Sequence, residues 1–390
     1  MKKVSHLVLS LIPILFISCS SGTIKISQDF DHGSIGELKE IQPDYFKGTT
    51  RHWLKRDGIG DQYYWFYFRA DQVKGKTITF ELNDLVGVYR GNEHIVYTDY
   101  TQPVYSYDQN NWYRIADVNY DSLNHTFIFS ERFDHEAAWI AYAHPYSYSR
   151  YRQLVSGLED EQYVSIEPIA TTAGGREIRM VSITDQDIQA DQKKVVLIMA
   201  IQHAGEDAGG YFVEGMIDYI LSDTPDAAVI RENYIYKFLP MMNPDGMYKG
   251  VSRYNSRMED LNNIWMNDDR AQEEVSGVKH WTDQWLGSGE SLDLFIDVHN
   301  HSQHHKYNAF ISLDEELDSL VLCMNHSWPI RSLHAEFEGS SCAWFQSRDI
   351  SSGTIELSQS RINEGPYLTI EDYYQYGEGT VKAISEYFSL

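Results

Sequence analysis

A histidine and a glutamate three residues apart, His203 and Glu206, lie in the segment IQHAGED at residues 201–207. If a helix begins here, both side chains fall on one face and can converge on a single ion. An imidazole nitrogen and a carboxylate oxygen, completed by a distant second histidine, form a catalytic zinc set that leaves one coordination position open for water. Pairs with this spacing also occur by chance on protein surfaces, so the features downstream decide between the two interpretations.

The second histidine is expected at His299. It follows residues 294–298, an apolar run that predicts a buried strand. His299 is favoured as the third ligand because it lies closest to the rigid strand, and His301 or Asp297 is a candidate for the group that fixes a ligand's tautomer. Two neighbouring histidines are expected to be exposed in a loop, His304 and His305.

Hydrolysis at such a site also needs a base. Zinc lowers the pKa of water to about 7, but a carboxylate must take the proton and hand it to the leaving amine. Glu356, in the strand-like segment 353–357, fits this role, and the alternative is a glutamate on the solvent side of an edge strand. Arg253 and Asn262, in loops between the ligands, are suited to polarise a carbonyl or to hold a carboxylate.

The elements that must position these side chains alternate between strands and helices. Residues 193–200, directly before the first ligands, are an apolar run bounded by charge, which predicts a buried parallel strand. A loop at the carboxyl end of such a strand is where open α/β sheets bind ligands. The chain from residue 153 onward predicts a mixed or parallel sheet flanked by helices. The expected strands include 178–183, 195–199 and 235–239, and the expected helices are 211–221 and 379–388.

The upstream part of the chain, from about residue 30 to 151, is rich in strand signals and holds no long segment of helical period. An aromatic run at 63–69, an alternating run at 77–82 and further short strands separated by turns predict an antiparallel β-sandwich. The predicted division of the chain is a signal peptide at 1–18, a lipidated cysteine and tether at 19–28, a β-sandwich domain at 29–151 and an α/β catalytic domain at 152–390.

The N-terminus predicts export. Two lysines precede an apolar run at 7–17 that is too short to span a bilayer, which is typical of a signal peptide. The run ends in a sequence that resembles a bacterial lipoprotein box, so Cys19 is expected to carry a lipid, and plain secretory cleavage near Ser18 is the alternative. The chain is therefore expected in the bacterial envelope, periplasmic or attached to the outer membrane, with the lipid anchor as its only membrane contact. The remaining cysteines could pair or remain two buried thiols, Cys323 and Cys342.

Composition limits the classes of partner. An apolar content of 42% and an aromatic content of 14% fit a folded globular protein. The net charge of −25 argues against a nucleic-acid partner and against docking on anionic lipid. The expected partner is a peptide or amide substrate, and the chain is expected to act as a monomer.

The order and spacing of the motifs resemble the zinc metallocarboxypeptidase family, of the carboxypeptidase A-like type. The motifs are His-x-x-Glu at 203–206, Asn-Pro-Asp-Gly at 243–246, Arg253 nine residues before Asn262, the strand-terminal His299, and Thr-x-Glu at 354–356. The upstream aromatic segments, together with Trp344 twelve residues before Glu356, are similar to the cytosolic-carboxypeptidase-like subfamily. In that subfamily a β-sandwich precedes the catalytic domain.

This resemblance implies one zinc ion per chain, bound by His203, Glu206 and His299. It also implies that Glu356 activates the water and that Arg253 polarises the scissile carbonyl and stabilises the oxyanion. Asn262 would help to hold the terminal carboxylate of the substrate.

Two departures from the family pattern bear on the substrate. The family usually has Asp-Leu-Asn-Arg-Asn-Trp where this chain has Asp-Leu-Asn-Asn-Ile-Trp at 260–265, so Asn263 stands in place of the arginine that clamps a free C-terminal carboxylate. Loss of such a charge-assisted pair costs about 1.5 to 3 kcal/mol, and Arg257 is the candidate to replace it. Phe345 stands where relatives that trim glutamate side chains carry a basic residue. The residues expected to contact the substrate are Asn262, Asn263, Arg257 and Trp344.

The predicted function is that of a zinc-dependent metallocarboxypeptidase, which hydrolyses a C-terminal peptide or amide bond with zinc-activated water and Glu356 as general base. One alternative keeps the chemistry and changes the substrate: a zinc amidase, endopeptidase or deacylase that acts on an envelope-derived molecule. The other alternative is a catalytically inactive binding lipoprotein.

Overall fold

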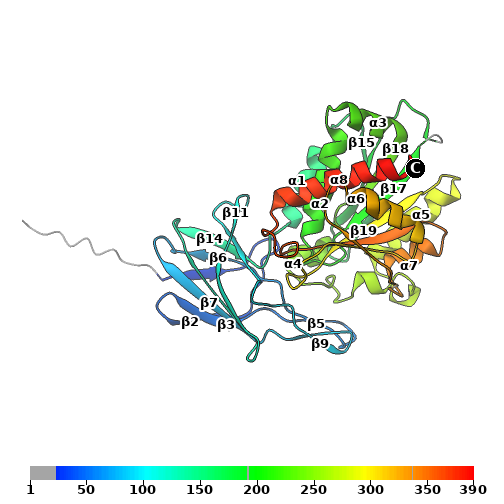
Figure 1. Ribbon diagram of the computed structural model, residues 1–390. Helices are drawn as coiled ribbons and strands as arrows, with labels where there is room; N and C mark the ends of the chain where they lie inside the picture. The colour runs from blue at the N-terminus through cyan, green and yellow to red at the C-terminus, as the bar shows by residue number, and fades with distance from the viewer. Residues whose placement is uncertain (1–22, 191–192, 336) are drawn as a thin grey trace, which may run out of the picture.

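The computed structural model describes residues 23–190, 193–335 and 337–390 (Figure 1). The predicted signal peptide at 1–18, the predicted lipidation at Cys19 and part of the predicted tether lie outside the described residues. No helix in the described ranges is both long enough and apolar enough to cross a membrane.

Two five-stranded sheets form the first part of the chain. One has the order β1 (Lys25–Ser27), β6 (Tyr67–Asp71), β14 (Ala137–Ala141), β10 (Val104–Ser106) and β11 (Trp112–Arg114). The other has the order β12 (Asp117–Asp121), β13 (Thr126–Arg132), β7 (Thr77–Asn83), β3 (Tyr45–Thr49) and β2 (Leu38–Gln42). Their strand pairs are antiparallel except for β3 and β7, which run parallel.

The core of this part consists of aromatic side chains contributed by both sheets. Phe66 stacks on Phe129 with ring centroids 5.7 Å apart, and Phe80 lies 5.2 Å from both Phe68 and Phe129. Residues on β7 alternate between buried and half-buried positions, as the polar–apolar alternation of the sequence requires. The predicted β-sandwich is thereby confirmed.

A small third sheet, formed by strands that lie between sandwich strands in the sequence, was not predicted from the sequence patterns. Its order is β4 (Trp53–Leu54), β5 (Asp61–Gln62), β8 (Gly87–Tyr89) and β9 (Asn92–His94). In Figure 1 it extends from the sandwich along the lower side of the second part of the chain. The β8–β9 hairpin contacts the second part of the chain, because Arg90 donates to Asn263 and the ring centroid of His94 lies 6.2 Å from that of His304.

An eight-stranded mixed sheet forms the framework of the second part. Its order is β15 (Val164–Thr171), β16 (Glu177–Ile183), β18 (Tyr234–Leu239), β17 (Lys194–Ala200), β19 (Leu294–Asn300), β22 (Ser352–Leu357), β20 (Ala309–Ile311) and β21 (Arg331–Leu333). The four inner strands β18, β17, β19 and β22 are parallel to their neighbours in that set. The predicted α/β sheet is confirmed, and its inner strands end at one edge.

Helices cover both faces of this sheet (Figure 1). Val196 and Ile198 of β17 pack on the face that carries most of the helices, whereas Val195 and Leu197 pack on the opposite face. The first face carries α1 (Tyr148–Gly157), α2 (Ala208–Leu221), α3 (Pro225–Asn233), α6 (Asp318–Met324) and α8 (Ile370–Tyr387). The second carries α5 (Glu273–Gly287) and α7 (Ser341–Gln346). The short helices are α4 (Pro244–Lys249), η2 (Leu261–Asn263), η3 (Asp268–Arg270) and η4 (Glu315–Leu317).

Several boundaries differ from the predicted ones. The predicted helix 379–388 is the last part of α8, which begins at Ile370 behind a capping box formed by Thr369 and Asp372. The predicted domain boundary after residue 151 stays a prediction, and that residue lies within α1. Cys323 and Cys342 are both buried free thiols, so they do not form a disulfide.

Candidate metal and catalytic site

The first two candidate ligands lie in the loop between β17 and α2. This loop begins with Ile201 at φ +54°, a conformation that β-branched residues rarely adopt. The helix begins only at Ala208, so the expectation that a helix aligns His203 and Glu206 is wrong. Instead, a tight turn in which Glu206 N donates to His203 O over 3.2 Å brings the two side chains together.

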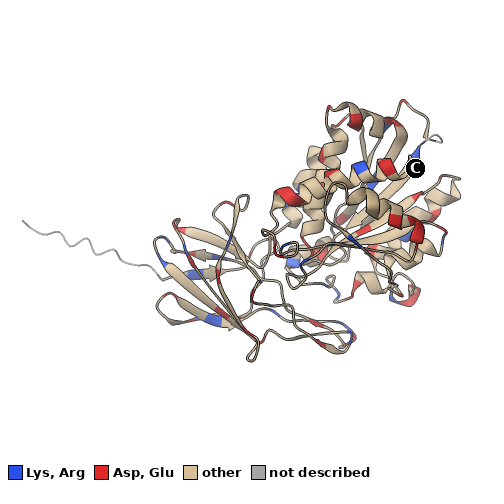
Figure 2. Ribbon diagram, in the orientation of Figure 1, with Lys and Arg blue, Asp and Glu red and all other residues tan. Residues whose placement is uncertain are grey.

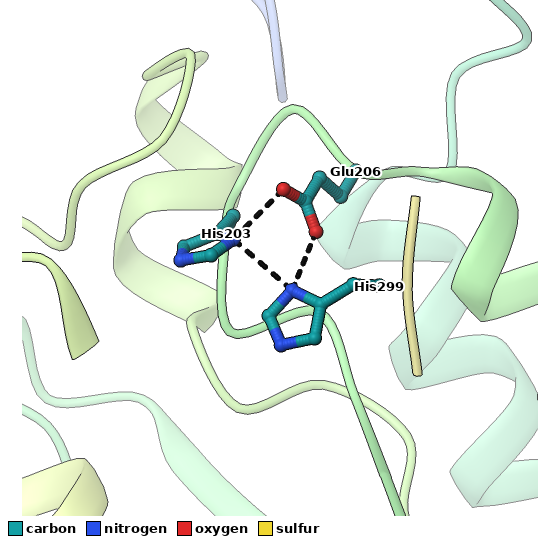
Figure 3. Close-up of side chains that lie close together, drawn as sticks. All are labelled: His203, Glu206 and His299. Atoms are coloured by element: carbon teal, nitrogen blue, oxygen red, sulfur yellow. Dashed lines mark hydrogen bonds and ion pairs between the residues drawn. The ribbon is translucent and has the colours of Figure 1, made fainter. Parts of the chain in front are cut away.

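His203, Glu206 and His299 converge on one point (Figure 3). Nδ1 of His203 lies 2.7 Å from Oε1 of Glu206, and Nδ1 of His299 lies 2.7 Å from Oε2 of the same carboxylate. The two Nδ1 atoms are 3.1 Å apart. The three residues are 2%, 6% and 1% exposed, which is far below what surface residues of these types show. One donor atom from each residue is therefore available to a single small cation.

The outer nitrogen of each histidine faces a carboxylate. Nε2 of His299 lies 2.9 Å from Oδ2 of Asp297, and Nε2 of His203 lies 3.1 Å from Oδ1 of Asp260. A carboxylate at Nε2 holds the proton there and leaves Nδ1 as the free lone pair, which is how metal-binding histidines are oriented. Two nitrogens and one carboxylate that converge in this way fit a catalytic zinc site.

The charges at this point stabilise one another. Burial alone raises the pKa of Glu206, but the charges of His203 and His299 outweigh it and hold the pKa well below its usual range. Burial lowers the pKa of His299, but Asp297 and Glu206 raise it well above its usual value, so the ring gives up a proton from Nδ1 when a metal binds. The pocket therefore keeps the carboxylate ionised, as a metal ligand must be.

Arg253 joins the site through Asp260. Its Nε donates to Oδ2 of Asp260 over 2.8 Å, and its Nη1 lies 3.6 Å from Oε1 of Glu206. Burial lowers the pKa of Arg253, and the charge of Asp260 raises it well above its usual value. Asp260 thus orients two groups: the permanent cation of Arg253 beside Glu206, and the imidazole of His203.

Glu356 lies on β22, directly opposite His299 on β19 in the parallel register. Because β22 lies between β19 and β20, the alternative of a solvent-facing glutamate on an edge strand is excluded. Burial and the nearby charge of Glu206 raise the pKa of Glu356 to about 7. A carboxyl group with this pKa can both accept and release a proton near neutral pH.

The residues expected to contact the substrate do not all lie together. Nδ2 of Asn262 is 3.3 Å from Nε2 of His299, which places Asn262 against the ligands. Asn263 follows it in η2 and accepts a hydrogen bond from Arg90 over 3.4 Å. The Arg257 side chain is 44% exposed and pairs with Glu273 at 2.7 Å, and no hydrogen bond or ion pair joins it to Asn262 or Asn263 among the described residues. Trp344 is 4% exposed and packs in the core between α5, α7 and the sheet.

A cluster of imidazoles adjoins Glu356. Nδ1 of His301 lies 3.6 Å from Oε2 of Glu356, and its ring centroid is 4.3 Å from that of His305. The ring centroid of His304 is 4.0 Å from that of His305. Burial lowers the pKa of His301 and of His304 to about 3. The expectation that His304 and His305 are exposed is wrong, because both are half-buried and the ring centroid of His94, on the β8–β9 hairpin, lies 6.2 Å from that of His304.

Three residues at the site had no role in the sequence-based account. Asp260 was part of a recognised motif, and its position two residues before Asn262 was the available signal. Tyr89 and Arg90 come from the sandwich side of the chain, more than 100 positions before the ligands, and no local pattern connects them to the site.

Two family models match most of the chain. The model described as zinc carboxypeptidase matches residues 152–309, a range that includes the three candidate ligands and Arg253 but not Glu356. The model described as cytosolic carboxypeptidase N-terminal domain matches residues 26–143.

Named relatives and solved structures agree with these models. Cytosolic carboxypeptidase 6 of Mus musculus is 26% identical over 302 residues, which are 72% of this chain and 54% of that protein. Its Homo sapiens counterpart is 28% identical over 294 residues, 70% of this chain and 56% of that protein. The chain therefore spans about half the length of the curated relatives it matches.

The fold is also that of solved metallocarboxypeptidases. A metallo-carboxypeptidase from Burkholderia cenocepacia aligns with a TM-score of 0.81 at 21% identity, over 94% of this chain and 99% of that one. A metallo-carboxypeptidase from Pseudomonas aeruginosa aligns with a TM-score of 0.77 at 22% identity, over 94% and 99% of the two chains. At these identities the match concerns the fold.

The relatives contradict the predicted location. They are named cytosolic carboxypeptidases, and residues 26–143 match the model described as cytosolic carboxypeptidase N-terminal domain, which is at odds with an exported envelope lipoprotein. The prediction relied on a basic and apolar composition over the first residues and on Cys19. These residues lie outside the described part of the chain, and the prediction of an exported, lipid-anchored protein is withdrawn.

Proposed function

Because the chain belongs to the zinc carboxypeptidase family, we propose that it is a metallopeptidase that hydrolyses the amide bond before the C-terminal residue of a peptide. The observation that carries the proposal is the convergence of Nδ1 of His203, Nδ1 of His299 and the carboxylate of Glu206 within 4.8 Å of one another. The family match supports it independently. Nothing in the comparisons favours an amidase, an endopeptidase, a deacylase or an inactive binding protein.

In this proposal His203, Glu206 and His299 hold one zinc ion. A zinc ion so held supplies Lewis-acid chemistry, since it lowers the pKa of water to about 7 and polarises a carbonyl. Asp297 and Asp260 keep the two imidazoles turned toward the ion.

Glu356 is the proposed general base. It faces the site from the strand next to His299, and its pKa of about 7 suits proton transfer in both directions. It takes a proton from the attacking water, whose hydroxyl adds to the acyl carbon of the scissile amide. It then delivers that proton to the departing amine, so the C–N bond breaks and one water is consumed.

Arg253 is proposed to stabilise the oxyanion that develops on the scissile carbonyl. Its guanidinium is fixed by Asp260, so it needs no reorganisation when the charge appears. Asn262, beside His299, offers an amide to the polar groups of the substrate.

The test replaces the base and leaves the ligands in place. Glu356→Gln is expected to lower kcat by about a hundred- to ten-thousandfold on a peptide with a free C-terminus. Its zinc content, measured by atomic emission after dialysis, is expected to remain near one ion per chain. Glu371→Gln, on the exposed first turn of α8, is the matched control and is expected to leave kcat unchanged. Full activity of Glu356→Gln with zinc bound would overturn the proposed role.

A further inference from the structure

We infer that Arg90, at the tip of the β8–β9 hairpin, binds a carboxylate on the C-terminal residue of the substrate. The inference rests on the proposed function and deepens it, because it assigns the specificity of the site to a residue of the N-terminal β part of the chain. That carboxylate belongs either to the main-chain terminus or to the side chain of the last residue.

The hairpin is built against the candidate site. The guanidinium carbon of Arg253 lies 5.1 Å from the ring centroid of Tyr89, and that of Arg90 lies 5.3 Å from the same ring. Such distances are those of cation–π contacts. The Tyr89 ring therefore holds one arginine of the hairpin near the arginine that adjoins Glu206.

Arg90 also reaches the loop that flanks the ligands. Its Nη2 donates to Oδ1 of Asn263 over 3.4 Å. Asn263 follows Asn262 in η2, and Nδ2 of Asn262 lies 3.3 Å from Nε2 of His299. Arg90 is thus linked to the metal-binding residues on two sides, through Tyr89 and through the asparagine turn.

The other cations around the asparagine turn already have carboxylate partners. Arg253 donates to Asp260, Arg257 pairs with Glu273 at 2.7 Å, and Lys279 pairs with Asp268 at 2.8 Å. Within the described residues, the polar contact of Arg90 is the neutral amide of Asn263, and Arg90 forms no ion pair.

Arg90 is one of several arginines without an ion pair among the described residues, and its position beside Asn263 and the Tyr89 ring distinguishes it. The chain has 57 acidic and 32 basic residues, and Figure 2 shows that the acidic ones are spread over both parts of the molecule. An arginine that stays without a carboxylate partner in so acidic a molecule has its donors free for an acidic ligand.

The backbone at Arg90 gives a second, independent indication. Tyr89 pairs with Asn92, so Arg90 and Gly91 form a two-residue hairpin loop, with φ values of +51° and +78°. Turns with two positive φ values favour Asn-Gly, whereas arginine with its long side chain is disfavoured at the first position. A residue that conflicts with the local preference of its turn is expected where function requires it.

The test measures binding in the full chain with Glu356→Gln, so that no peptide is consumed. Each of four peptides is titrated into the zinc-free chain and into the zinc-loaded chain. The peptides differ only in their C-terminal residue, which is alanine with a free acid, alanine amide, glutamate with a free acid or glutamine with a free acid. The added substitution is Arg90→Asn, and Arg51→Asn is the matched control. Arg51 is an exposed arginine of the same β part that lies 5.2 Å from the Trp53 ring, away from the hairpin tip.

The expected result is a loss of discrimination. Arg90→Asn weakens the binding of the peptide that carries the recognised carboxylate about ten- to a hundredfold, the usual range for one charge-assisted contact. Its neutral counterpart binds as before. A change in the acid-to-amide ratio assigns the contact to the main-chain terminus, and a change in the glutamate-to-glutamine ratio assigns it to the side chain.

A purely structural role predicts something else. Arg90→Asn creates an Asn-Gly turn, so its Tm is expected to equal or exceed that of the parent. A lower Tm with equal weakening of all four peptides would overturn the inference, as would unchanged ratios or a parent that binds acids no better than their neutral counterparts. Failure of the proposed function would be seen in a different assay. The zinc-loaded chain with Glu356 intact would then cleave no peptide, whatever ratios the binding titrations gave.

Discussion

Oδ2 of Asp297 lies 2.9 Å from Nε2 of His299, on the side of the ring away from Glu206. Asp297 is fully buried on β19 and also accepts a hydrogen bond from Gln202 Nε2. Its carboxylate therefore fixes the orientation of His299 before any ligand binds.

We expect Asp297→Asn to weaken zinc binding about ten- to a hundredfold, which is typical when a partner behind a metal-binding histidine is removed. Competition with a chromogenic chelator measures the affinity. Asp293→Asn removes a carboxylate next to the start of the same strand, where it pairs with Lys194, and is expected to leave the zinc affinity as it was. Equal affinities for the wild-type chain and Asp297→Asn would contradict this account of the site.

Asp260 connects a candidate ligand to the candidate oxyanion-binding residue. Its two oxygens face Nε2 of His203 and Nε of Arg253. Asp260→Asn is expected to lower kcat/KM for a free-acid peptide by at least about tenfold, because it loosens both groups at once. Arg253→Gln in the same background should then cost less than it does in the wild-type chain, since the two residues act as a unit. Fully additive losses in this double-mutant cycle would show that Asp260 does not act through Arg253.

The site was predictable from the sequence to the extent that its chemistry is local. His203, His299 and Glu356 directly follow or lie within apolar strands, and the parallel arrangement of those strands brings their ends to one edge. The loop geometry at Ile201 was not predictable, because a positive φ at a β-branched residue depends on tertiary contacts. The contacts of Arg90 with Asn263 and of His94 with His304 could not be predicted either. They depend on how the small third sheet packs against residues far along the chain.

Glu274 gives the chain a dependence of stability on pH. It lies in the first turn of α5, and burial raises its pKa to about 7 from an ordinary value of 4.5. One oxygen accepts from Asn255 over 3.3 Å, and the other is buried with no partner among the described residues. The folded state therefore binds the proton more tightly than the unfolded state, so the free energy of unfolding falls as pH rises from about 4.5 to about 7.

Glu274→Gln removes the charge that becomes costly above pH 7. We expect the variant to be about 1 to 3 kcal/mol more stable than the wild-type chain at pH 8 and about equal at pH 5. Urea denaturation at the two pH values measures this difference. Glu273→Gln, the neighbouring residue that pairs with Arg257, is the control and should show the same offset at both values. A Glu274→Gln offset that does not change with pH would rule out the raised pKa.

His32, in the β part of the chain, contacts the loop between β17 and α2 that carries His203 and Glu206. Its Nε2 lies 2.9 Å from Oδ1 of Asp207, directly after Glu206, and its Nδ1 lies 2.9 Å from Met247 O. Both His32 and Asp207 are fully buried. Burial raises the pKa of Asp207, against the opposing charge of His32.

His32→Ala is expected to lower the free energy of unfolding by about 3 kcal/mol, because it leaves the buried Asp207 carboxyl group without its imidazole partner. This loss of free energy lies at the lower end of the range for breaking a buried pair, because Tyr146 N still donates to Asp207 over 2.6 Å. Differential scanning calorimetry would record the loss as a lower Tm. His326→Ala, at a 67% exposed side chain, is the control and should change the Tm little. A wild-type Tm for His32→Ala would mean that the contact does not hold the two parts together.

Zinc-dependent removal of a C-terminal residue by water leaves an isotopic label in the shortened peptide. The full chain is stripped with a chelator, divided, and incubated in H₂¹⁸O with a free-acid peptide, with and without added zinc, before mass spectrometry. We expect a product shorter by one residue that carries one ¹⁸O in its new carboxyl group, formed only in the zinc-loaded sample. Internal fragments, or the same product in both samples, would exclude zinc-dependent removal of the last residue.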